Sequence, residues 1–138
     1  MANLKELLRV FGEAFNEPAI YQGNVPGDAY LKALLEKDHF IALAAFDDQK
    51  VVGGLAAYVL EKFEQQRKEI YIYDLAVAEA YRRQGIATAL INLLKLIAKE
   101  IGAYIIFVQA DKVDTPAIKL YESLGKAEDV YNFDIDVT

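Results

Sequence analysis

The chain has 138 residues, of which 54% are hydrophobic, so it is long enough for one domain with a sizeable core and too short for two ordinary domains. It contains no cysteine, and His39 is its single histidine, which excludes disulfides, thiolate metal sites, a cysteine nucleophile and a multi-histidine metal site. The net charge of −6 disfavours general binding to nucleic acid and would attract a cationic small partner, although an acidic balance also serves solubility. No stretch resembles a signal peptide or a membrane span, so we expect one cytoplasmic domain over residues 1–138 with no metal, nucleic-acid or membrane partner.

The first elements are expected to be helical. Apolar residues recur at helical spacing from Leu4 to Phe15, which predicts a helix over that range. Prolines and glycines make residues 16–28 rich in turn signals, and this stretch should end the helix. Asp28 is then expected to cap a second short helix from Ala29 to Lys37.

A β-hairpin follows. The continuous apolar run from Phe40 to Phe46 and the run from Val51 to Leu60 are strand-like, and residues 47–50 form a tight polar turn between them. His39, at the start of the first strand, is most simply structural. A charged connection leads to a third strand-like run, Glu69 to Val77.

The second half alternates helices and strands. We expect a helix over residues 87–101, a strand over residues 104–109, a helix from Thr115 to Leu124 that Gly125 ends, and a last strand from Val130 to Val137. The order predicts an α/β chain with a mixed, mostly antiparallel open sheet and a βαβ crossover in its second half.

Asp74 breaks the pattern of its strand. Strict alternation would place it on the same face as Ile70 and Ile72, where an unpartnered carboxylate is costly. We therefore expect a β-bulge near Tyr73 and Asp74 that shifts the register by one residue. The bulge would free backbone N–H groups that could hold a carbonyl oxygen as it becomes an oxyanion. A purely structural aspartate at a strand end would leave the same pattern.

The stretch Arg82-Arg83-Gln84-Gly85-Ile86-Ala87 lies between this strand and the next helix. Its glycine permits close approach of the backbone, and the first turn of the helix adds unpaired amides and a positive dipole end. These features favour an anion site such as a phosphate-binding loop. Alone, a basic pair before a glycine is a weak signal, because most such pairs are solvated surface.

Two motifs carry a resemblance to a known family. The strand ending Leu75-Ala76-Val77 leads to the loop pattern Arg-x-x-Gly-x-Ala, and a later helix carries Ala117, Tyr121 and Gly125 at the spacing of a second signature. On these motifs the chain resembles the GNAT superfamily of N-acetyltransferases. The resemblance implies the GNAT fold around an acyl-CoA site, apparently lacking the first strand, with acetyl-CoA as cosubstrate.

The resemblance also implies the acetyl-CoA contacts. Backbone groups at the end of the strand would pair with the pantetheine arm, and the amides of the loop would wrap the pyrophosphate. Asp114 stands where the superfamily usually has Asn, which affects a side-chain contact to the cosubstrate. The implied cosubstrate-binding residues are Leu75, Ala76, Val77, Arg82, Arg83, Gln84, Gly85, Ile86, Ala87, Thr88, Asp114 and Ala117.

Within the superfamily, the segments between Phe40 and Gln109 and the ending Phe133-Asp134-Ile135-Asp136 are similar to class I aminoglycoside 3-N-acetyltransferases. This similarity implies acetylation of the 3-amino group of gentamicin-like aminoglycosides, an antibiotic-resistance activity, and a homodimer. Direct transfer needs a base, an oxyanion site and an acid for the leaving thiolate. Asp74 is the candidate base, Glu69 a second base acting through water, and Tyr121 the candidate acid by resemblance.

Acidic side chains border the expected entrance for a polycation. The candidate substrate-binding residues are Tyr73, Asp74, Glu61, Glu64, Asp134 and Asp136. Asp134 and Asp136 would project from one face of a strand, as multipoint ammonium recognition requires, although a solvated edge strand has the same spacing. Two alternatives remain open: an acetyltransferase for polyamines or another small amine, and a CoA-binding module without catalysis. Transfer to a protein N-terminus has no special use for an acidic entrance.

Overall fold

A four-stranded open sheet in the order β1-β2-β3-β4 organises the chain. The computed structural model describes residues 2–23 and 25–138. The elements are α1 (Ala2–Ala14), α2 (Pro18–Gln22), α3 (Asp28–Leu35), β1 (Phe40–Asp47), β2 (Lys50–Glu61), β3 (Lys68–Val77), a 3-10 turn (Glu79–Tyr81), α4 (Ile86–Ile101), β4 (Ala103–Val108) and α5 (Thr115–Glu122).

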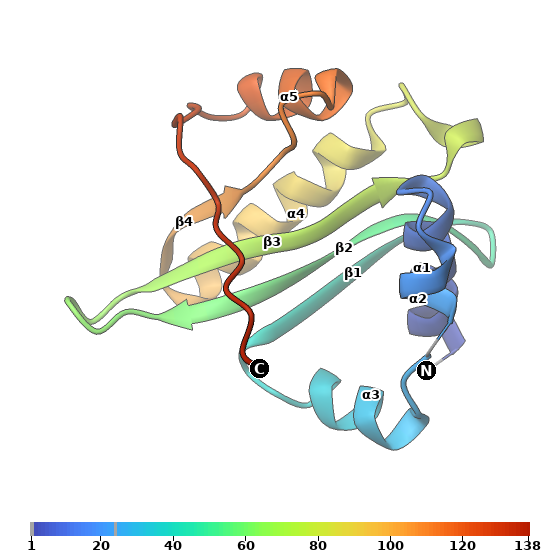
Figure 1. The fold of residues 1–138 in the computed structure, drawn as a ribbon, viewed down its shortest axis with the longest axis horizontal. Helices are drawn as coiled ribbons and strands as arrows, with labels where there is room; N and C mark the ends of the chain where they lie inside the picture. Colours follow the sequence, from blue (N-terminus) through green and yellow to red (C-terminus); the bar gives the residue numbers. More distant parts are fainter. Residues whose placement is uncertain (1, 24) are drawn as a thin grey trace.

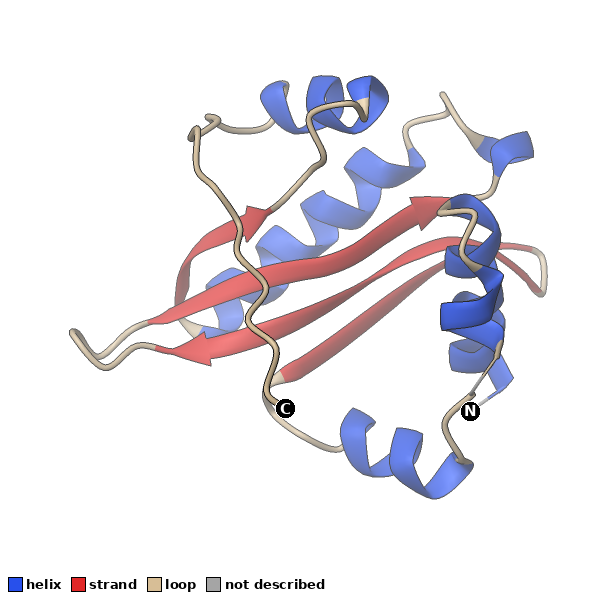
Figure 2. Cartoon of the chain, in the orientation of Figure 1, coloured by secondary structure: helices blue, strands red, loops and turns tan. Residues whose placement is uncertain are grey.

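The strand pairing matches the predicted class. β1, β2 and β3 pair antiparallel in succession, whereas β4 returns through α4 to lie parallel to β3. Figure 1 shows α4 behind the sheet and the two N-terminal helices, α1 and α2, at its front near the end of β3. Figure 2 shows the same arrangement by type of element, with all four strands in one layer. The open, mixed and mostly antiparallel sheet expected from the sequence is therefore confirmed, as is the βαβ crossover through α4.

Alternation along the strands divides the core into two layers. On the α4 side, Leu55, Ile70 and Leu94 are fully buried and form the centre of the larger layer. On the opposite side, α1 packs Leu7 onto β2 in a smaller layer. Gly54 leaves room for α1 on this face of β2, because a Cβ at that position would come within 2.6 Å of Leu7 Cδ1. Helix α1 therefore lies close to β2, which pairs with the part of β3 that carries Asp74.

Two details of the N-terminal prediction are wrong. The turn-rich stretch, in which we predicted no helix, contains the five-residue helix α2, which Pro18 begins at a position where its missing N–H costs nothing. Asp28 lies inside the first turn of α3 and pairs with Lys5, and the residue at the N-cap is Gly27. A carboxylate near a helix N-terminus is stabilised by the helix dipole without capping it.

The last predicted strand is absent from the described residues. From Lys126 to Thr138 the chain is extended and exposed, and it joins no ladder of the sheet. In Figure 1 this segment, which we call the tail, passes in front of β3 and β2 at a steep angle to the strands. The alternating sequence of residues 130–137 is strand-like, but a strand requires a neighbouring backbone to pair with, and no described strand of this chain pairs with the tail.

The described residues contain no helix that is both long enough and apolar enough to cross a bilayer.

Candidate active site

The predicted bulge in β3 is confirmed. Asp74 pairs with Ala56 and Ile72 pairs with Ala57, so Tyr73 is the extra residue without a partner on β2. The register shift turns Asp74 away from the face of Ile70 and Ile72 and toward the side of the sheet where α1 and α2 lie. In a β-bulge, two residues of one strand lie opposite a single residue of the neighbouring strand, and the side chain that follows the extra residue changes direction.

The Asp74 carboxylate is half-buried and has one side-chain partner. Tyr21 Oη, from α2, donates a hydrogen bond of 2.8 Å to Asp74 Oδ1. Burial raises the pKa of Asp74 above its ordinary value, and the bond from Tyr21 opposes part of that shift. Burial and the nearby carboxylate also raise the pKa of Tyr21, which therefore remains a donor at neutral pH. The ionised Asp74 carboxylate thus accepts a proton more readily than an exposed aspartate does, and among the described residues its one side-chain hydrogen bond is to Oδ1.

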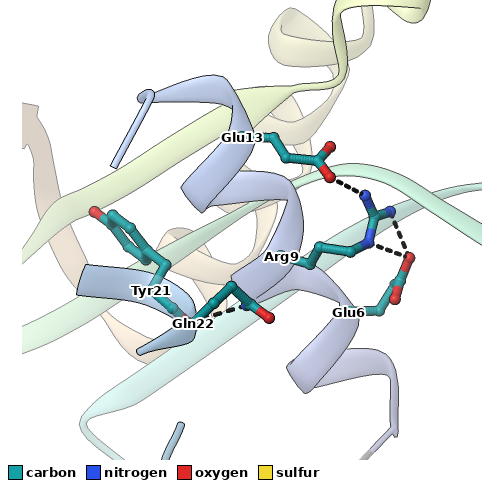
Figure 3. A network of polar contacts seen from close by, with 5 residues as sticks. All are labelled: Glu6, Arg9, Glu13, Tyr21 and Gln22. Carbon is teal, nitrogen blue, oxygen red and sulfur yellow. Dashed lines mark hydrogen bonds and ion pairs between the residues drawn. The ribbon is translucent and has the colours of Figure 1, made fainter. Parts of the chain in front are cut away.

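Tyr21 is fixed by an aromatic cluster and by close helix packing. Its ring meets Phe11 edge-on at 6.1 Å and Phe15 at 5.7 Å between centroids. At Gly12 an added Cβ would lie 3.1 Å from Tyr21 Cβ, so the glycine permits α1 and α2 to approach. Figure 3 shows the Tyr21 ring pointing away from Arg9, whose guanidinium is paired with Glu6 and Glu13 on the exposed side of α1.

A row of aromatic rings continues the Asp74 face across the sheet. Tyr58 lies between Phe40 at 5.4 Å and Tyr73 at 6.0 Å, measured between ring centroids. Tyr71 follows, in edge contact with Tyr73 and stacked on Phe107 at 4.7 Å with an interplanar angle of 2°. Tyr73 is 64% exposed. Apart from the stacked pair, neighbouring rings meet at 53° to 85°, and the row forms a partly exposed aromatic platform of the kind that packs against sugar rings and attracts cations.

A cavity of about 200 Å³ lies between this face and helices α1 and α3. Most of its lining is apolar, including Phe11 and Leu31, and Asp74 is its one ionisable carboxylate. This volume is below the range of ordinary small-molecule sites, so only part of a ligand would enter it. The aromatic platform would have to carry the rest.

The two parallel strands separate beside Asp74. Pairing between β3 and β4 ends at Ile72 and Val108, whereas β3 continues to Val77. Leu75, Ala76 and Val77 therefore pair with β2 alone, and their outer edge is open to another extended group. The predicted pantetheine-binding residues lie on this open edge.

The loop after β3 has the backbone geometry that an anion site requires. Arg83 and Gly85 have positive φ values of 62° and 78°, and α4 begins directly after Gly85. The amides of the first helical turn, at Ile86, Ala87 and Thr88, have no carbonyl partner within the helix. Arg82 Nε donates a 3.0 Å bond to Val77 O and joins the loop to the end of the strand, and Gln84 completes the turn.

The second motif lies on α5. Tyr121 packs against the larger core layer, and burial, with a smaller effect of Asp114, raises its pKa to about 12. Asp114 is the N-cap of α5 and accepts a bond of 3.2 Å from Ala117 N. The aspartate that departs from the family pattern thus has a structural role, because a capping carboxylate satisfies a free amide.

The other predicted acidic residues lie apart from Asp74. Glu69 is at the start of β3, where it accepts a 2.7 Å bond from Tyr104 Oη. Glu61 lies opposite Lys68 in the strand register, next to the β2–β3 turn. It is five residues along β2 from Ala56, the register partner of Asp74, so the backbones of Glu61 and Ala56 are about 17 Å apart. Glu64 is bound to Arg67 in the same turn. The structure brings none of these three carboxylates into contact with Asp74.

Asp134 and Asp136 lie on the tail, away from any strand. Asp134 accepts a bond from Asn132 Nδ2 at 3.3 Å and Asp136 one from Thr138 N at 3.1 Å. Both are exposed, and the tail passes in front of the face that carries the aromatic platform (Figure 1). Their alternate spacing is retained along the extended chain, but the predicted strand that would fix their direction is not formed.

Sequence reasoning missed Tyr21 and the aromatic platform. Tyr21 lies among turn signals in a helix of five residues, and nothing local indicates that it reaches a residue 53 positions away. The platform could have been found, because alternation places Tyr71 and Tyr73 on one face and the hairpin register adds Tyr58.

Solved structures of acetyltransferases resemble this chain over almost its whole length. The chain is 59% identical to an aminoglycoside acetyltransferase from an uncultured soil metagenomic sample, covering 99% of this chain and 91% of that one with a TM-score of 0.98. It is 34% identical to a second soil enzyme of that description, solved in complex with sisomicin, with coverage of 99% and 90% and a TM-score of 0.91.

The curated relatives are N-acetyltransferases, some of them N-alpha-acetyltransferases. N-alpha-acetyltransferase 50 of Danio rerio is 30% identical over 89% of this chain and 68% of its own length. Human N-acetyltransferase 8 is 30% identical over 59% of this chain, and the match spans 36% of that protein. The chain thus corresponds to about a third of this longer relative.

The family model described as "Acetyltransferase (GNAT) family" matches residues 4–126. That range includes the bulged strand, the loop before α4 and the Tyr121 helix, and members of the family use acetyl-CoA as acetyl donor. The chain belongs to the GNAT family of acetyltransferases.

Proposed function

We propose that this protein transfers the acetyl group of acetyl-CoA to an amino group of an aminoglycoside, with the 3-amino group of gentamicin-type compounds as its target. The observation that carries the proposal is the half-buried Asp74, turned by the bulge toward an aromatic platform and held by Tyr21. A carboxylate whose pKa is raised by burial, next to a row of aromatic rings, suits an amine on a sugar-like ring. The likeness to a solved aminoglycoside acetyltransferase at 59% identity supports this class of acceptor.

Acetyl-CoA would bind where β3 and β4 separate. Its pantetheine arm would extend along the open edge of Leu75 to Val77, and its pyrophosphate would meet the amides from Arg83 to Thr88. Asp114 and Ala117, at the start of α5, would lie on the other side of the arm. The thioester would then reach the bulge at Tyr73, where a backbone N–H freed from the β2 ladder can bind the carbonyl oxygen.

The transfer requires the amine to lose protons, the carbonyl oxygen to carry a negative charge for a time, and the leaving thiolate to gain a proton. Asp74 takes a proton from the substrate ammonium, and the free amine nitrogen then attacks the thioester carbon. A C–N bond forms, negative charge develops on the carbonyl oxygen at the bulge, and the C–S bond breaks as the tetrahedral intermediate collapses. Tyr121, which burial keeps protonated, gives its proton to the departing thiolate. The attacking nitrogen loses its second proton as the neutral amide forms, and this proton restores the Tyr121 hydroxyl, while Asp74 releases the first proton to solvent. The products are the N-acetylated amine and CoA with a free thiol.

The acceptor would lie mainly on the platform. Because the cavity of about 200 Å³ admits only a ring edge, the remaining rings would stack on Tyr73 and Tyr71. Asp134 and Asp136 on the tail would face the other ammonium groups, whereas Glu61, Glu64 and Glu69 contribute only at the far end of a long acceptor. Acetylation neutralises one ammonium group and would reduce the antibiotic's affinity for an anionic target.

A thiol-release assay tests the proposal. Purified protein and acetyl-CoA are given sisomicin, gentamicin or fortimicin, the CoA thiol is measured, and the acetyl position on the product is located by NMR. We expect turnover and acetylation at the 3-amino group. Release of no thiol with any of the three compounds would refute the aminoglycoside assignment, and acetylation at another amine would refute the 3-amino position.

A peptide acceptor is the second candidate, because curated relatives at 30% identity include N-alpha-acetyltransferases. The same assay with short peptides bearing a free N-terminus, and with spermidine as a polyamine, ranks the candidates by kcat/KM. Binding of acetyl-CoA in calorimetry without acetylation of any acceptor would identify a CoA-binding module without catalysis.

A further inference from the structure

The cavity beside Asp74 is lined mostly by apolar side chains. It lies between α1, α3 and one face of the sheet, with a volume of about 200 Å³. Leu7, Phe11 and Leu31 in its lining are almost fully buried. Among the described lining residues, Asp74 is the only one with a charged side chain. The cavity therefore has a place for one cationic group and an apolar space beside it.

The size of the cavity suits a compact molecule. In general, an apolar protein cavity of about 150 Å³ is large enough to bind benzene. An aminoglycoside would enter this space with one ring edge only, whereas a six-carbon chain or a single phenyl ring can enter it whole. Each CH2 group that leaves water for such a site strengthens binding by about fourfold. A small apolar amine would thus gain affinity from the lining.

Helix α3 supplies one wall of the cavity. Leu31 and Leu34 on this helix line the cavity, whereas Leu35, the next residue along, lines a separate groove against β1. Lys5 Nζ of α1 and Asp28 Oδ1 of α3 are 2.5 Å apart, and this ion pair joins the two helices. Leu34 and Leu35 therefore occupy neighbouring positions inside and outside the cavity.

We propose that this protein also acetylates primary monoamines with a compact apolar body, with the ammonium group at Asp74 and the carbon chain or ring inside the cavity. The inference rests on the proposed acetyl transfer and adds a second class of acceptor to it. The amine nitrogen forms a C–N bond to the acetyl carbon as the C–S bond of acetyl-CoA breaks. Of the two protons that the nitrogen loses, one ends on the CoA thiol and the other is released to solvent. The Phe40 and Tyr58 rings, 5.4 Å apart between centroids, lie beside the carbon part.

The cavity should reject a second ammonium group. Hexylamine and 1,6-hexanediamine have the same six-carbon chain, but the diamine would place an unpaired charge among leucine and phenylalanine side chains, which is costly. The net charge of −6 by itself would favour the diamine. We expect hexylamine to exceed 1,6-hexanediamine in kcat/KM by at least about tenfold. It should also exceed butylamine by about tenfold, because two more CH2 groups are buried.

Thiol release at amine concentrations well below KM tests the inference on the parent chain and on two variants. Leu34→Trp fills part of the cavity and should reduce kcat/KM for hexylamine by at least about tenfold. The matched control Leu35→Trp makes the same change in the separate groove and should stay within about twofold of the parent. Thermal melts confirm that both variants fold.

The outcomes separate this inference from the aminoglycoside assignment. Turnover of sisomicin without turnover of hexylamine would overturn the inference alone, as would a diamine used as well as hexylamine. Equal use of hexylamine by the two variants would overturn the binding of its carbon chain in the cavity. Turnover of hexylamine without turnover of sisomicin would support the inference and refute the aminoglycoside assignment. Thiol release with neither amine would refute both.

Discussion

Tyr21 Oη and Asp74 Oδ1 are 2.8 Å apart, although 53 positions separate the two residues in the chain. The bond joins a five-residue helix to the bulge of the central strand. It supplies the one side-chain donor of a half-buried carboxylate, and so it stabilises the ionised form of the candidate base.

Removing this donor should shift the pH profile. In Tyr21→Phe the carboxylate loses a hydrogen bond that lowers its pKa, so the pKa of Asp74 should rise further. We expect the acid limb of kcat/KM to move to higher pH, with a loss of about tenfold at neutral pH and a smaller loss in alkali. The comparison is a pH series of thiol-release rates at acceptor concentrations well below KM, where the rate reports kcat/KM.

Tyr81→Phe is the matched control, because Tyr81 Oη also donates a 2.8 Å bond to a carboxylate, that of Asp47. Its acid limb should coincide with that of the parent. A shift of equal size in both variants would show that the effect does not pass through Asp74.

Asp74→Asn should separate activity from stability. The pKa of Asp74 is higher in the folded chain than in the unfolded chain, so the ionised carboxylate lowers the stability of the fold at pH values above the folded-state pKa. The effect disappears in acid, where Asp74 is protonated in both the folded and the unfolded chain. We expect the Tm of the variant to exceed that of the parent by an amount that grows from acidic to neutral pH. Its kcat should fall by about 10² to 10⁴. Thermal melts at several pH values check the first statement, and a Tm difference independent of pH contradicts it.

Gly12→Ala tests positioning at a distance. The new Cβ would lie 3.1 Å from Tyr21 Cβ and would push α2 away by a few tenths of an ångström, which lengthens the bond to Asp74. Alanine at the same time favours helix α1 by about 0.5–1 kcal/mol. We expect a lower kcat, by less than in Tyr21→Phe, with no loss of Tm. A kcat equal to that of the parent would show that Tyr21 tolerates the displacement.

Gly85→Ala should weaken acetyl-CoA binding. Gly85 has φ 78° and nothing within 4 Å of an added Cβ, so the cost is backbone strain of about 1–2 kcal/mol, which distorts the loop. We expect the dissociation constant for CoA to rise about fivefold to thirtyfold in calorimetry.

Gly102→Ala is the control for that strain, because Gly102 has φ 79°, equally open surroundings and a place at the far end of α4. Both variants should lose similar stability, and only Gly85→Ala should lose affinity. Equal affinities would place the pyrophosphate elsewhere.

Tyr121→Phe should slow the chemical step. The raised pKa of about 12 keeps this hydroxyl protonated, and the variant removes the proton that the thiolate would take. We expect kcat to fall by about 10², with little change in the affinity for acetyl-CoA. An unchanged kcat would mean that solvent or another group protonates the thiolate.

Much of the fold could be predicted from short-range patterns. The helices around Leu7 and Leu94 follow from apolar spacing, and the hairpin from two apolar runs around a polar turn. The bulge was predictable because a carboxylate in an apolar strand face is costly, and a one-residue shift removes that cost.

What the sequence determined by itself is therefore local: most of the elements, the bulge that turns Asp74, and the loop in which Gly85 lets the backbone approach an anion closely. Only the tertiary structure decided that Tyr21 reaches Asp74, that the aromatic rings form one platform, and that the tail finds no strand partner among the described residues. The physical reason is the distance along the chain over which each kind of interaction acts. Backbone preferences and periodicity act over a few residues, whereas contacts between distant segments depend on how helices and sheet pack together.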